Sequence, residues 1–99
     1  MKIISSAVVL TFAVLSSSVL AADIEAGKAK SATCVACHGP TGVSSNPLWP
    51  NLAGQHEAYL AKQIKAFRDG ERNDPLMAPM VAALTDEDIA NLAAYFAAQ

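Results

Sequence analysis

The sequence is poor in the residues from which metal sites and catalytic sites are usually built. Its 99 residues include two cysteines and two histidines. A structural zinc site needs four ligands, usually with a second Cys or Cys/His pair, and beyond the cysteine pair and its neighbouring histidine only His56 could contribute. The chain also has no Ser/His/Asp set, phosphate-binding loop or catalytic carboxylate pair. These absences argue against an enzyme and against structural zinc.

Two further absences bear on the fold and on the membrane. No segment alternates apolar and polar residues as a half-buried strand does, so we expect an all-α fold. The apolar run from Ile3 to Leu15 is interrupted by Ser5, Ser6 and Thr11, and it is shorter than the ~20 residues that a membrane-spanning helix needs. We therefore expect no stable membrane insertion of the mature chain.

The N-terminal segment has the layout of an export signal. Lys2 supplies a basic start, the apolar run follows, and the small residues that come next suit cleavage after Ala21 or Ala22. We therefore expect residues 1–21 to be a signal peptide and residues 22–99 to be one mature domain. An uncleaved membrane anchor is the alternative.

The charge balance is slightly acidic and limits the partners. The formal net charge is −2, and removal of residues 1–21 takes away Lys2 and no acidic residue, which makes it −3. This argues against nucleic acid or an anionic membrane surface as a partner. A domain of this size is marginally stable by itself, so a large apolar cofactor would supply much of the missing core.

The most informative motif is Cys34-Val35-Ala36-Cys37-His38, which matches the signature of covalent c-type haem attachment. Residues three apart lie on the same side of a helical turn, so both thiols can face one macrocycle and bond its two vinyl groups. His38 then lies under the ring and can bind the iron. A redox disulfide is the alternative, but a thioredoxin-like motif needs alternating strands and helices, which this chain lacks.

Three main helices are expected, and loops connect them. Gly27 interrupts the first helix and costs ~1 kcal/mol against alanine there, which indicates a close approach by another helix. The charged residues of the second helix, Arg68 among them, lie mainly off its apolar stripe and are expected to be solvated. Residues 39–54 and 71–81 read as loops. The helices are expected over Asp23–Thr33, Gln55–Arg68 and, after a capping box at Thr85, up to about Ala97.

The second iron ligand is expected to be a methionine, because a soft thioether favours ferrous iron in an electron-transfer haem. Met77 and Met80 both lie in the loop before the last helix, beside Pro75 and Pro79. A methionine can also simply fill a gap in the core, and at least one of these two must do so. His56 is a third candidate, although a surface role suits it better.

Three segments in this order resemble class I cytochrome c, and closest are the small bacterial periplasmic monohaem cytochromes and single halves of the dihaem kind. The resemblance covers essentially all of the mature chain. The haem-attachment motif is the most specific of the features and the methionine loop the least. The segments are Cys34-Val35-Ala36-Cys37-His38, Pro50-Asn51-Leu52-Ala53-Gly54 and, after the methionine loop, Leu92-Ala93-Ala94-Tyr95-Phe96.

The resemblance implies a role for individual residues. Cys34 and Cys37 would hold one haem c, His38 would be the proximal iron ligand, and the Pro50 carbonyl would accept a hydrogen bond from the other His38 nitrogen. The spacing of related chains favours Met77 over Met80 as the opposite ligand. The resemblance also implies export to the periplasm and a first helix that meets Leu92, Tyr95 and Phe96 of the last helix at Gly27.

With both iron positions filled by protein ligands, the iron has no site for a substrate. We therefore expect a periplasmic single-electron carrier that is not an enzyme and whose partners are redox protein donors and acceptors. The chain would be a monomer or a subunit of a redox complex. The alternatives are a haem c subunit of a periplasmic dehydrogenase and a peroxidase-like or gas-binding haem protein.

Overall fold

The computed structural model describes residues 1–13 and 21–99. Residues 1–13 form no helix or strand and are exposed. The predicted signal peptide also includes residues 14–20, which lie outside the described residues. Among the residues that the structure describes, no helix has the length and apolar character needed to cross a membrane.

All regular structure in the described part of the chain is helical, as predicted. The three longer helices correspond to the three that the sequence indicates, with shorter ends, and between them lie short helical segments. In order these are α1 (Ile24–Lys30), the 3-10 turn η1 (Ser31–Thr33), α2 (Val35–His38), α3 (Glu57–Arg68), α4 (Met77–Val81) and α5 (Asp86–Ala97).

The ends of α1 and α5 are set by side chains close in sequence. Asp23 caps α1 by accepting a hydrogen bond from the Ala26 backbone N–H (3.1 Å). At the start of α5 the Thr85 hydroxyl accepts from the Asp88 N–H, and the Asp88 carboxylate accepts from the Thr85 N–H, both at 3.0 Å. The predicted capping box is therefore present, with Asp in place of the usual Glu.

Helix α4 corrects the prediction that residues 71–81 form a loop. Asp74 Oδ1 accepts hydrogen bonds from the N–H groups of Leu76 (2.8 Å) and Met77 (3.1 Å), which organises the start of the helix. Pro79 is the third residue of α4, where a backbone N–H has no partner inside the helix. The proline that suggested a loop is therefore compatible with this first turn.

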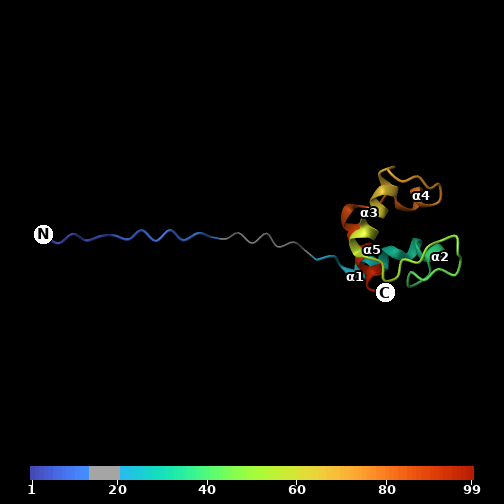
Figure 1. Ribbon diagram of the computed structural model, residues 1–99, viewed down its shortest axis with the longest axis horizontal. Helices are drawn as coiled ribbons and strands as arrows, with labels where there is room; N and C mark the ends of the chain where they lie inside the picture. The colour runs from blue at the N-terminus through green and yellow to red at the C-terminus, as the bar shows by residue number, and fades with distance from the viewer. Residues whose placement is uncertain (14–20) are drawn as a thin grey trace.

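Helix α5 forms the centre of the core and packs against both α1 and α3. Its Leu92 and Phe96 are almost completely buried and form one cluster with Leu60 of α3. In Figure 1 the segments that carry α2 and α4 both project from the same side of the three longer helices. The three longer helices thus support two connecting segments that carry the sequence-predicted site residues. We call them the first arm (residues 31–56, between α1 and α3) and the second arm (residues 69–84, between α3 and α5).

The crossing of α1 and α5 is close at Gly27, which is buried. A Cβ atom on Gly27 would overlap the Asn91 carbonyl, with its carbon 2.6 Å away, and would lie 2.9 Å from the Tyr95 Cβ. The expected close approach is therefore present. Its nearest partner is the Asn91 backbone rather than Leu92 or Phe96, because the glycine sits over the α5 main chain.

Candidate functional site

The two cysteines lie one helical turn apart: Cys34 stands between η1 and α2, and Cys37 lies in α2. The N–H groups of Cys37 and His38 both donate to the Cys34 carbonyl, at 3.3 and 2.9 Å. Both thiols are half-buried and neither forms a disulfide. Burial raises the pKa of the Cys34 thiol. Two free thiols on one turn are the arrangement that attachment to two vinyl groups requires.

His38 ends α2 and its ring orientation is set by the loop that follows. The side chain is 7% exposed, and its Nδ1 lies 2.8 Å from the carbonyl oxygen of Pro50. A carbonyl can only accept, so Nδ1 carries a proton, and in the neutral ring Nε2 is the nitrogen with the lone pair. Among the described residues Nε2 has no hydrogen-bond partner. The imidazole is therefore held in the tautomer that can bind a metal.

The loop that carries Pro50 is braced by hydrogen bonds that the sequence does not predict. Asn51 Oδ1 accepts from the Ser44 N–H at 2.7 Å, and the Ser44 hydroxyl lies 3.1 Å from the Cys37 carbonyl oxygen. The Gly42 carbonyl accepts from the N–H of Leu52 at 2.7 Å. The composition of this segment indicates a loop, but no spacing rule pairs Ser44 with Asn51. These bonds hold the Pro50 carbonyl against His38.

The two methionines occupy different positions on the second arm. Met77 is the first residue of α4 and is half-buried, whereas Met80 is 54% exposed. Helix α4 packs against α3, and α2 packs against η1, so His38 and Met77 lie on separate arms (Figure 1). His56, the third candidate, is exposed just before α3.

The stretches around α2 and α4 carry no charged side chains and expose several apolar ones. No Asp, Glu, Lys or Arg lies between Lys30 and Glu57 or between Asp74 and Asp86. Leu48 on the first arm and Leu76 on the second are 83% and 63% exposed. Within residues 1–13 and 21–99 no three His, Cys, Asp or Glu side chains are grouped to hold a metal ion. The donors and the apolar surfaces suit a large apolar group that brings its own iron.

The sequence model of the cytochrome c family matches residues 24–98, which include every helix that the structure describes. The chain belongs to the cytochrome c family. It is 52% identical over 82 residues to cytochrome c-554(548) of Halomonas halodenitrificans, a match that covers 80% of this chain and 99% of that protein.

Two longer proteins are also similar. The crystal structure of reduced recombinant cytochrome c4 from Pseudomonas stutzeri has a TM-score of 0.76 and 42% identity, and the match covers 80% of this chain and 46% of that one. The thiosulfate dehydrogenase electron acceptor of Stutzerimonas stutzeri (strain A1501) is 46% identical over 67 residues, which are 65% of this chain and 31% of that protein. The chain thus spans less than half of each longer protein.

Membership of the family confirms several predictions. The all-α cytochrome c fold, a covalently bound haem c and a role as an electron carrier rather than an enzyme agree with the family match and with the Halomonas relative. The partners of such a carrier are redox proteins. Haem c supplies one iron that gains and loses a single electron, and the described thiols and imidazole suit its attachment.

Proposed function

We propose that this chain is a periplasmic single-electron carrier whose haem c is bonded to Cys34 and Cys37, with His38 and Met77 as the axial iron ligands. The observation that carries the proposal is the 2.8 Å contact between His38 Nδ1 and the Pro50 carbonyl. It commits one ring nitrogen to the protein and leaves the other for iron. With a second protein ligand opposite, no iron position is open to a substrate.

The choice of Met77 rests on its position in the second arm. It starts α4 and is half-buried, and its N–H is bonded to Asp74. Met80 is more exposed. The hydrogen bond to Asp74 fixes the backbone at Met77, which suits a weak ligand.

The axial ligands can be tested with the ferric protein. Methionine bound to Fe(III) gives a weak red absorption band, which Met77→Ala should abolish and Met80→Ala should retain. The matched pair changes the same residue type three positions apart in one helix. Loss of the band in Met80→Ala alone would overturn the assignment of Met77.

The attachment of the haem can be tested in a denaturing gel. The variant Cys34→Ala/Cys37→Ala should lose the covalent haem stain, and each single variant should keep one thioether and a shifted pyridine haemochrome spectrum. A double variant that still stains would contradict attachment at these thiols.

Export is part of the same proposal. Residues 1–21 are proposed to be a signal peptide that is cleaved after Ala21 or Ala22. The mass and N-terminal sequence of the protein from a periplasmic extract test this, and a mature chain that still begins at Met1 would support the membrane anchor instead.

A second candidate function is an electron-accepting subunit of a dehydrogenase complex. The similarity to a protein named thiosulfate dehydrogenase electron acceptor favours it. Purification of the native protein separates the two roles: a free monomer supports the mobile carrier, and constant stoichiometric co-purification with an oxidoreductase supports the subunit.

A further inference from the structure

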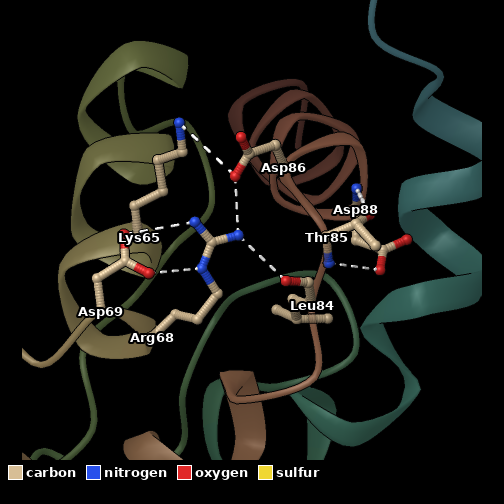
Figure 2. A network of polar contacts seen from close by, with 7 residues as sticks. All are labelled: Lys65, Arg68, Asp69, Leu84, Thr85, Asp86 and Asp88. Carbon is tan, nitrogen blue, oxygen red and sulfur yellow. Dashed lines mark hydrogen bonds and ion pairs between the residues drawn. The ribbon is translucent and has the colours of Figure 1, made fainter.

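Arg68, the last residue of α3, is not the solvated charge that its position off the apolar stripe suggests. Its side chain is only 18% exposed. Figure 2 shows the guanidinium between the end of α3 and the stretch that leads into α5, with bonding partners on both sides. Nε lies 2.8 Å from Asp69 Oδ1, and Nη1 lies 3.1 Å from the Leu84 carbonyl oxygen and 2.8 Å from Asp86 Oδ1.

These partners lie at the two ends of one chain segment. Asp69 is the first residue of the segment that connects α3 to α5. Leu84 is its last residue, directly before Thr85, which caps α5. Residues 69–84 between them include the whole of α4 and both methionines of the mature chain. One guanidinium thus joins the two ends of the segment that is proposed to supply the second iron ligand.

The planar fork of arginine is needed for this arrangement. Its donors are fixed in one plane and point in several directions, so it reaches two carboxylates and a backbone carbonyl at once. The ammonium of lysine is a compact point charge with no such fork. Hydrogen bonds to Asp69 and then to Asp86 raise the pKa of Arg68 above its ordinary value, so the group is charged at neutral pH.

We propose that Arg68 is a positioning residue for the haem: by linking the two ends of residues 69–84, it holds the ligating methionine against the iron. The proposal rests on methionine ligation from this segment but not on which methionine ligates. Without this link residues 69–84 would sample more conformations, and the thioether would have to find the iron from among them. The thioether would then give way more easily to a competing ligand.

An ordinary surface ion pair contributes little to stability, so a purely structural role must be separated from positioning. Lys65 provides the matched control. It lies on the same helix and also pairs with Asp86, at 3.8 Å, but it is 47% exposed and has no bond to Leu84. Lys65→Met removes one charge near Asp86 and leaves the contacts of Arg68 with Leu84 and Asp86 in place.

The experiment is displacement of the methionine by imidazole in the full-length ferric holoprotein, followed by loss of the weak red band. We expect Arg68→Met to bind imidazole at least fivefold more tightly than the wild type, and Lys65→Met to stay within twofold. Far-UV circular dichroism at each imidazole concentration shows that the helices remain folded. Arg68→Lys keeps the charge without the fork and should behave like Arg68→Met.

Three outcomes would overturn the proposal: unchanged imidazole affinity in a folded Arg68→Met, wild-type behaviour of Arg68→Lys, or an equal gain in Lys65→Met. The assignment of Met77 fails separately. If Met80→Ala alone abolishes the red band, that assignment is wrong, yet Arg68 still closes the segment that holds the ligand. If neither methionine variant loses the band, both proposals fail.

Discussion

Replacement of Gly27 by alanine tests the close crossing of α1 and α5. The new methyl group would lie against the Asn91 carbonyl and 2.9 Å from the Tyr95 Cβ. Neither neighbour is the free end of a flexible side chain, so the helices themselves would have to separate. That movement would also strain the bond from the Asp23 N–H to Asn91 Oδ1, which is 2.8 Å long.

Two effects of opposite sign set the magnitude. Alanine is better than glycine inside a helix by about 1 kcal/mol. Overpacking costs about 1–3 kcal/mol, and the upper end applies because the obstacle is backbone. The net loss in the free energy of unfolding is therefore about 2 kcal/mol, which lowers Tm by roughly 8–16 °C in a domain of this size.

The measurement is guanidinium unfolding of the holoprotein, followed by far-UV circular dichroism, with thermal melts alongside. Ala29→Gly is the matched control, since Ala29 is exposed in the same helix, and it should lose only about 1 kcal/mol from helix propensity. If Gly27→Ala were as stable as the wild type or more stable, overpacking would cost no more than helix propensity gains, and the close crossing would be refuted.

Three smaller predictions follow from individual contacts. Tyr95→Phe removes the hydroxyl that donates to the Pro40 carbonyl at 3.1 Å and should cost about 1 kcal/mol; an unchanged thermal melt would contradict this bond. Phe96→Ala empties a site that is 1% exposed and should cost about 3–5 kcal/mol in urea unfolding, and a loss below 1 kcal/mol would count against the core described here. The hydrogen bond from the Thr85 backbone lowers the pKa of Asp88. The charged Asp88 therefore stabilises the folded protein fully above the ordinary carboxyl pKa of about 3.9, and this contribution is lost as the pH falls through the lower pKa of the folded state. Asp88→Asn should therefore reduce the difference between urea midpoints at pH 7 and pH 3, and an unchanged difference would show that Asp88 does not contribute.

Features that depend on neighbouring residues could be predicted from the sequence. The Asp23 cap, the Thr85 and Asp88 capping box and the helical turn of Cys34 and Cys37 each involve residues within three positions. Their geometry follows from the 3.6-residue period of the helix. The haem motif belongs to this class, which is why the cofactor was predictable.

Two predictions from the sequence, for α4 and for Arg68, were wrong for different reasons. Helix α4 was predicted as loop because Pro75 and Pro79 were both read as breakers, although Pro79 stands in a first turn, where proline is allowed. Arg68 was expected in water because helical spacing reports only the direction of a side chain from its own helix. Its partner Leu84 is 16 residues away, and no spacing rule connects them.

The sequence by itself determined the chemistry: two thiols one turn apart, an imidazole beside them and methionines further along. Local helix geometry is enough to align those thiols. Only the tertiary structure decided which groups brace one another: Ser44 and Asn51 in the Pro50 loop, the Asn91 backbone against Gly27, and Arg68 against Leu84. The physical reason is that these contacts join residues brought together by packing, and packing depends on the whole chain at once.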